Sequence, residues 1–149
     1  MNALTISKYI ICKCNKLGEE VTKLKLQKLL FFTEAYYMAI TDKNELFNEK
    51  FYAWTYGPVC KEVYDKYKKY YDLPIKENDC DKLEIISYEI EKVIDIICET
   101  FGSFSTSKLV NLTHMKNSPW YNTYTNSSTP ISKKETKEWF KENFLNNGI

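Results

Sequence analysis

The side chains able to do chemistry are few, and His114 is the single histidine among them. A catalytic triad, a histidine-ligated metal site or an acid–base pair would have to be built around it. Its neighbours, Leu-Thr-His-Met from residue 112 to residue 115, form neither a nucleophile elbow nor a helical H-E-x-x-H pattern. We therefore expect His114 to be a structural residue near the end of a helix, and we expect the chain not to be an enzyme.

Five cysteines could support disulfide or metal chemistry. They stand at positions 12, 14, 60, 80 and 98, an odd number at irregular spacings, and no two of them form a C-x-x-C pair. Cys12 and Cys14 are two residues apart, so on a helix their side chains would point away from each other. We expect reduced, structural thiols and no bound metal, as is usual in the cytoplasm.

Phosphate and cofactor chemistry also lacks a sequence signal. The four glycines stand alone, so there is no glycine-rich phosphate loop. Neighbouring carboxylates, such as Glu19 with Glu20, stand in solvated, amphipathic surroundings and are typical of an ordinary charged surface. No cofactor is predicted.

The charge balance argues against nucleic acid as a direct partner. All 21 residues counted as Lys or Arg are lysines, and the formal net charge is only +1. Phosphate binding needs a positive excess, and base recognition most often uses arginine. A helix-turn-helix made of the helix over 90–101, the turn at Gly102 and the helix after Ser105 would present little beyond Lys108 and Lys116, so a DNA-binding regulator is a less favoured alternative.

The aromatic content instead favours a protein partner. The chain has 12 Tyr, 8 Phe and 3 Trp, more than one small core comfortably buries. Tyrosine and tryptophan are enriched at protein interfaces because they offer rigid area with a polar end. For any single tyrosine, the alternative is that it lies at the edge of the core with its hydroxyl in water and contacts no partner.

The length of 149 residues predicts one domain spanning 1–149. The longest apolar stretch, residues 29–40, is shorter than the roughly 20 residues that a membrane span needs, and the N-terminus lacks a secretory pattern. We expect a cytoplasmic protein without membrane contact.

Hydrophobic periodicity predicts a mostly α fold with minor β structure: a compact bundle of about five to seven helices around a central apolar helix. Residues 22–41 form that central helix, because it is apolar nearly all round. A short strand or hairpin is predicted near residues 51–56, where Tyr52, Trp54 and Tyr56 would share a face. Further helices are predicted over 3–17, from Pro58 to about 71, over 90–101, after Ser105, at Pro119 and after Ser132. Residues 72–82 and 122–130 are predicted loops, and residues 83–87 fit either a loop or a strand.

Three stretches stand out: TKLKLQKLLFF (22–32), FYAWTYGPV (51–59) and LTHMKNSPW (112–120). Together they resemble the Panacea domain of SocA-like antitoxins, formerly a phage-associated domain of unknown function found in bacteria and mobile genetic elements. Their order and spacing span most of the chain. Lys116 departs from the pattern, because family members often carry an acidic residue in that turn.

The resemblance implies an antitoxin of a type II toxin–antitoxin system that neutralises a co-encoded toxin by direct binding. Alternatives are a phage or mobile-element protein that blocks a host defence protein, and an adaptor that delivers a toxin to a protease. The motif residues mark either the partner surface or the fold. They are Lys25, Gln27, Lys28, Trp54, Tyr56, Gly57, Pro58, Thr113, His114, Pro119 and Trp120. On the helix predicted over 22–41, Leu24, Leu26, Leu29 and Leu30 are expected in the core, and Lys25, Gln27 and Lys28 share the opposite side, where they could contact a partner.

Overall fold

A computed structural model describes residues 1–77, 79–126 and 128–147 of the chain. Within these residues it has seven α-helices and a two-stranded antiparallel hairpin, which confirms the mostly α class with minor β structure. The elements are α1 (Ala3–Lys16), α2 (Lys23–Thr41), β1 (Phe51–Trp54), β2 (Gly57–Cys60), α3 (Lys61–Tyr67), the 3-10 turn η1 (Lys68–Tyr70), α4 (Tyr88–Phe101), α5 (Thr106–Thr113), α6 (Pro119–Thr123), η2 (Tyr124–Asn126), α7 (Lys133–Asn143) and η3 (Leu145–Asn147).

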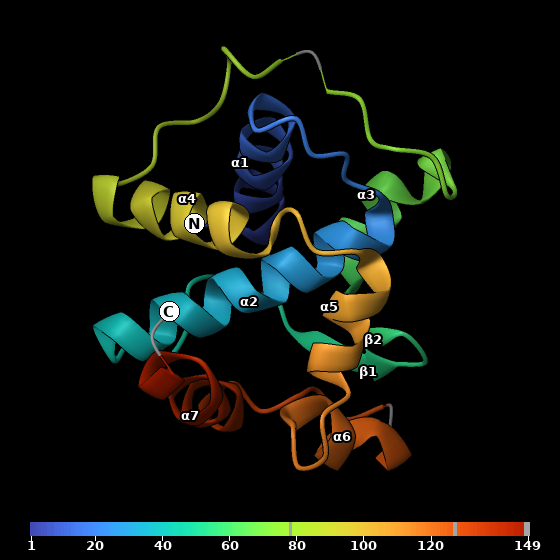
Figure 1. The fold of residues 1–149 in the computed structure, drawn as a ribbon, viewed down its shortest axis with the longest axis vertical. Coiled ribbons are helices and arrows are strands. Elements are labelled where there is room, and N and C mark those ends of the chain that lie inside the picture. Colours follow the sequence, from blue (N-terminus) through green and yellow to red (C-terminus); the bar gives the residue numbers. More distant parts are fainter. Residues whose placement is uncertain (78, 127, 148–149) are drawn as a thin grey trace.

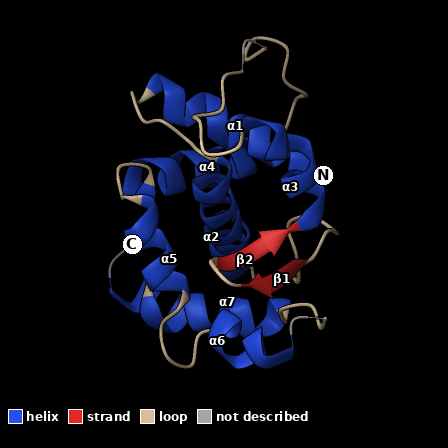
Figure 2. Ribbon diagram, turned by 90° about the vertical axis from the view of Figure 1, so that its right-hand side faces the viewer, coloured by secondary structure: helices blue, strands red, loops and turns tan. Residues whose placement is uncertain are grey.

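Helix α2 crosses the middle of the molecule, as expected for a helix that is apolar nearly all round (Figure 1). Every residue from 25 to 39 is buried. The helix contacts α1 and α4 on one side and α7 on the other, and it also meets α3, α5 and β2 (Figure 2). Thr22 caps its first turn by accepting a hydrogen bond from the Lys25 N–H at 3.3 Å. The predicted central helix is therefore confirmed.

A buried ion pair connects α2 to α7. Glu34 is 2% exposed, and its Oε2 lies 2.9 Å from Lys133 Nζ. The same oxygen accepts hydrogen bonds from the N–H groups of Leu46 and Phe47. Lys133 also donates to the Phe47 carbonyl. Burial raises the pKa of Glu34, while Lys133 and the two N–H groups act in the opposite direction.

Aromatic rings fill the space between α2, α4 and α7. Phe32 stacks on Phe101 with ring centroids 4.8 Å apart, and it also contacts Trp139 and Phe140. Phe144 meets Phe32 edge-on at 5.5 Å. Much of the unusual aromatic content is thus used to pack the core.

The hairpin corrects one prediction from the sequence. Pro58 does not begin a helix: residues 57–60 form strand β2, which pairs with β1 in the register Tyr52–Val59 and Trp54–Gly57, and α3 starts only at Lys61. Proline is acceptable here because the backbone polar groups of residues 58 and 60 face α2: the Pro58 carbonyl accepts from Lys28, and Cys60 pairs with Gln27. The N–H that proline lacks would point the same way as its carbonyl, so no hydrogen bond to β1 is lost. Proline at a first helical position and proline in an edge strand were not separable by local sequence.

Serines begin four of the later helices. Ser87, Ser105, Ser118 and Ser132 each accept a hydrogen bond from the N–H three residues ahead, at the starts of α4, α5, α6 and α7. The predicted starts after Ser105, at Pro119 and after Ser132 are confirmed. The loop predicted for 122–130 is partly wrong, because α6 continues to Thr123 and η2 follows; position 127 lies outside the described residues.

The connection that follows η1 carries the second correction. Residues 83–87 form no strand, so the loop alternative is the correct one. Cys80, in this connection, is joined to Cys12 of α1 by a disulfide with Cα atoms 5.8 Å apart. The expectation of reduced thiols is therefore wrong for these two residues, while Cys14, Cys60 and Cys98 are free and buried. The chain folds the two positions together across 68 residues, which no local spacing could reveal.

None of the helices in the described part of the chain has the length and apolar character to cross a membrane.

Candidate functional site

The three sequence stretches singled out above meet at one end of α2. The first forms the N-terminal half of α2, the second is the hairpin, and the third runs from the end of α5 into α6. Strand β2 contacts α2 and α5, and α6 contacts β1, so these segments lie side by side in both ribbon views (Figures 1 and 2). Residues far apart in the sequence therefore share one site.

Lys28 lies at the centre of this junction. It is 0% exposed, and its Nζ donates a hydrogen bond to the Pro58 carbonyl oxygen at 2.9 Å. Burial lowers the pKa of Lys28 to about 7, so the neutral amine is well populated near neutral pH.

Gly57 makes room for that amine. Its φ of +117° suits glycine, and a Cβ there would lie 2.7 Å from Lys28 Cε and 2.9 Å from Thr113 Oγ1. The glycine lets side chains of α2 and α5 both approach the hairpin closely at this point. The motif residues Lys28, Gly57 and Thr113 thus form one packed cluster.

Gln27 fastens the hairpin to α2. Its Oε1 accepts a hydrogen bond from the Cys60 N–H at 2.8 Å, and its Nε2 donates to the Cys60 carbonyl at 3.1 Å. The side-chain amide therefore pairs with β2 much as a third strand would. This explains why a glutamine is tolerated on a helix that is buried on every side.

The expectation that Lys25, Gln27 and Lys28 lie on the side of α2 away from the core is wrong. Their exposed fractions are 7%, 3% and 0%. Lys25 does not join the cluster around Gly57 but lies near Cys14, whose pKa is lowered by a hydrogen bond with Cys98 and further by the charge of Lys25. The helical period of 3.6 residues predicted that they share a polar face, but α2 has no solvent-facing side between residues 25 and 39.

His114 and Trp120 hold the third stretch in place. Their rings stack with centroids 3.6 Å apart and an interplanar angle of 10°. Trp120 Nε1 donates to the Trp54 carbonyl at 2.7 Å, which fastens α6 to the end of β1. Ser118 Oγ donates to the Thr113 carbonyl at 2.7 Å, and Pro119 is buried at the first position of α6.

His114 ends α5, as predicted, but its ring is held by stacking. Among the described residues, its buried Nε2 has no hydrogen-bond partner. Burial lowers the pKa of His114, and the charge of Lys28 lowers it further. Both effects favour the neutral imidazole. Lys116, where the chain departs from the family pattern, lies on the exposed turn after His114.

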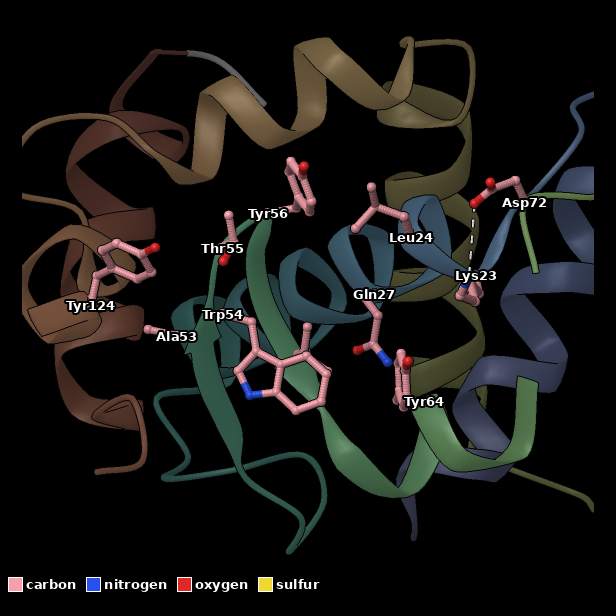
Figure 3. Close-up of a pocket in the computed structure, with 11 residues that line it drawn as sticks. Lys23, Leu24, Gln27, Ala53, Trp54, Thr55, Tyr56, Tyr64, Asp72 and Tyr124 are labelled. Carbon is pink, nitrogen blue, oxygen red and sulfur yellow. Dashed lines mark ion pairs between the residues drawn. The ribbon is translucent and has the colours of Figure 1, made fainter. Parts of the chain in front are cut away.

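A groove of about 850 Å³ opens beside this junction (Figure 3). Its walls come from the first turns of α2, the hairpin and α3, with Tyr124 of η2 on the far side of the hairpin. Trp54 and Tyr64 pack edge-on with ring centroids 5.2 Å apart. Most of the lining is apolar or aromatic: Leu24, Ala53, Trp54, Tyr56, Val59, Tyr64 and Tyr124.

The aromatic rim of the groove is accessible. Tyr56, at the tip of the hairpin, is 64% exposed, and Tyr124 is 40% exposed. The charged residues that line it are Lys23 and Asp72, joined at 3.8 Å, and Lys23 Nζ also donates to the Tyr71 carbonyl at 2.7 Å. An exposed aromatic groove whose charges are paired suits an uncharged, apolar surface of another molecule.

Sequence reasoning found part of this groove and missed part. Trp54 and Tyr56 were singled out and do line it, whereas Leu24 was expected in the core and Tyr64 was not named. In the sequence, Tyr64 lies between Val63 and Tyr67, the two buried residues of α3, and the local hydrophobic pattern gives no sign that Tyr64 faces the hairpin. Of the other predicted residues, Thr113 and Trp120 are buried and His114 is half-buried.

Nothing in the described stretches groups three or more His, Cys, Asp or Glu side chains in a way that could hold a metal ion.

Comparison with known proteins identifies the family. The model of the family described as "Antitoxin SocA-like, Panacea domain" matches residues 26–121, which contain most of the junction and most of the groove. The chain is 30% identical over 131 residues to a curated relative, Antitoxin SocA of Caulobacter vibrioides (strain NA1000 / CB15N), and the match covers 80% of this chain and 69% of that protein. No solved structure matches the chain. Together these matches show that the chain belongs to the SocA-like Panacea-domain family of antitoxins.

Proposed function

We propose that this protein is the antitoxin of a type II toxin–antitoxin system and that it neutralises a co-encoded toxin by direct binding. Family membership supports an antitoxin role. The observation that carries direct binding is the groove beside the hairpin, where aromatic side chains are exposed next to a rigid junction. Such side chains are the usual energetic anchors of protein interfaces.

In this proposal the motif residues have two separate tasks. Gln27, Lys28, Gly57 and Trp120 hold the hairpin against α2 and α6. That arrangement presents Trp54 and Tyr56 in a fixed orientation, so little conformational entropy is lost when a partner binds. The toxin would contact the groove, and the motifs behind it would act by positioning.

We also propose that the protein is not an enzyme. The functional groups nearest the groove already have structural partners: the Gln27 amide is bound to Cys60 and the Lys28 amine to Pro58. Stoichiometric binding of a partner at the groove does not require the Gln27 amide or the Lys28 amine to react. A protein partner is thus the simplest ligand for the groove.

Co-expression tests the proposal. The gene adjacent to the one that encodes this chain is induced alone and together with this chain in a bacterial host, and growth, toxin level and copurification are measured. We expect the neighbour to stop growth, this chain to restore it, and the two proteins to copurify as a stable complex. The proposal is overturned if the neighbour is harmless or if growth returns without a complex.

The toxin level separates the mechanisms. Direct blocking leaves the toxin abundant and bound, whereas delivery to a protease restores growth while the toxin disappears. If the neighbour is harmless and the chain instead copurifies with a host defence protein, the mobile-element alternative replaces the antitoxin proposal.

A further inference from the structure

The connection between η1 and α4 is long, and most of its described residues are exposed. It passes over α1 as an arch at the top of the molecule (Figure 1). Near its start the Ile75 N–H donates to the Val21 carbonyl at 2.8 Å, and near its end Tyr9 donates through its hydroxyl to the Glu84 carbonyl at 2.5 Å. Between these two points, in the part that the structure describes, the Cys12–Cys80 disulfide is the covalent attachment to α1.

The two cysteines of this link differ from the three free ones. Cys12 is 5% exposed and lies beneath the connection, and Cys80 is half-buried within it. Cys14, only two residues from Cys12, points into the core beside Cys98. Helix geometry therefore separates the two members of the C-x-C sequence, and only Cys12 can reach Cys80.

We propose that Cys12 and Cys80 form a reversible redox clasp. Oxidation fastens the middle of the connection to α1, and reduction releases it. The inference stands on the cysteine geometry and is independent of the proposed antitoxin function.

The chemistry is thiol–disulfide exchange with a small disulfide such as oxidised glutathione. The Cys80 thiol is the more accessible, so its thiolate attacks the glutathione disulfide. A Cys80–glutathione mixed disulfide forms, and one glutathione leaves as the thiolate. The Cys12 thiolate then attacks the Cys80 sulfur, and the second glutathione leaves. Two protein thiols are oxidised, one glutathione disulfide is reduced to two thiols, and the two protons go to the leaving thiolates.

Release should stay local. Helix α1 packs on α2 and α4 through buried residues such as Ile6 and Ile10, which the clasp does not involve. The released segment carries exposed lysines on both sides of Cys80, at positions 76 and 82. Reduction is therefore expected to change how easily a protease cuts the connection while the helical core stays folded.

Peptide mapping tests the link itself. The full-length protein is equilibrated with oxidised glutathione, denatured in the presence of an alkylating reagent so that the buried thiols also react, and digested with trypsin, which cuts after lysine. We expect the peptide 9–13 to be cross-linked to the peptide 77–82, with Cys14, Cys60 and Cys98 alkylated. Reduction should remove the cross-link and leave all five cysteines alkylated. Free Cys12 and Cys80 under oxidising conditions, or a Cys12–Cys14 bond, would overturn the proposal.

Native proteolysis tests its consequence. Cleavage after Lys76 and Lys82 should be at least about tenfold faster in the reduced protein than in the oxidised one, with unchanged helical circular dichroism. The double variant Cys12→Ser/Cys80→Ser should be cut at the fast rate in both buffers. Cys60→Ala, the matched control outside the clasp, should keep the difference. Equal cleavage rates in oxidised and reduced wild-type protein would refute the clasp, and that comparison needs no variant to fold.

Discussion

The Lys28 amine donates a hydrogen bond to the carbonyl oxygen of Pro58 over 2.9 Å, inside the protein and out of contact with solvent. This bond joins α2 to the hairpin, and both of these elements line the aromatic groove. A hydrophobic side chain at position 28 could fill the space but would leave the Pro58 carbonyl without its donor. The lysine is thus a structural residue of the junction.

The buried Lys28 should make the stability of the protein depend on pH. The folded-state pKa is about 7, below the ordinary value of 10.5, so between these values the unfolded chain binds more protons. The cost of burying Lys28 is therefore largest below pH 7 and shrinks as the pH rises toward 10.5. Relative to Lys28→Met, the wild-type free energy of unfolding should rise by up to about 1.4 kcal/mol per pH unit in this window.

Urea unfolding of both proteins at pH 7, 8 and 9 measures this difference directly, because the other titrating groups are shared. A wild-type–variant difference that does not change across this range would show that Lys28 keeps its ordinary pKa.

Gly57 should tolerate substitution less well than Gly18. Both have positive φ, +117° and +79°, but a Cβ at Gly18 meets nothing within 4 Å, whereas one at Gly57 runs into Lys28 and Thr113. Gly18→Ala is expected to cost about 1 kcal/mol of unfolding free energy from backbone conformation alone, and Gly57→Ala about 2 to 4 kcal/mol. Thermal and urea unfolding of the two variants provide the comparison. Equal losses would mean that the close packing around Gly57 is unimportant.

Removing the partner of Glu34 should be costly. Lys133→Met leaves a buried carboxylate without its cation, and the expected loss is about 3 kcal/mol at pH 7. The loss should be smaller at pH 5, because protonated Glu34 has no charge to stabilise and burial already raises its pKa. Lys137→Met, on the same helix, removes one of the two lysine partners of the exposed Asp42, the other being Lys141, and should cost less than about 1 kcal/mol. Chemical denaturation at both pH values distinguishes the two sites, and similar losses for the two variants would contradict a special role for Glu34.

Tyr56 should matter for the partner but not for the fold. It is 64% exposed at the tip of the hairpin, so Tyr56→Ala should change the unfolding free energy by no more than about 0.5 kcal/mol. If the toxin binds the groove, its affinity should fall by about tenfold or more. Tyr88→Ala is the matched control, because Tyr88 is 74% exposed at the start of α4, away from the groove. Titration calorimetry with purified toxin gives both affinities; unchanged binding by Tyr56→Ala would place the interface elsewhere.

Much of the fold could be predicted because its signals are local. The long apolar run of α2 has to be buried in any fold. The serines at 105, 118 and 132 specify helix starts because each accepts a hydrogen bond from the N–H only three residues ahead. Pro58 was misassigned because proline fits both a first helical turn and an edge strand. The choice depended on Gln27 and Lys28, which are about 30 residues away in the sequence.

The candidate site was predictable as a set of residues but not as an arrangement. The three motifs identified the stretches that meet beside α2, and Trp54 and Tyr56 do line the groove. The sequence could not show that Gln27 and Lys28 face inward, because a polar side chain on a helix normally indicates solvent. It also could not pair Cys12 with Cys80, since two cysteines 68 residues apart can meet only after the chain has folded.

The sequence by itself therefore determined the helical class, the central helix and the family, because these depend on periodicity, capping and motif order along the chain. Tertiary structure alone decided that Lys28 and Gln27 of the first motif form hydrogen bonds with the hairpin and that aromatic side chains form a groove. It also decided that one cysteine pair is bonded. Each of these features depends on a distance between residues that are remote in sequence, and only the packing of α2 against its neighbours sets those distances.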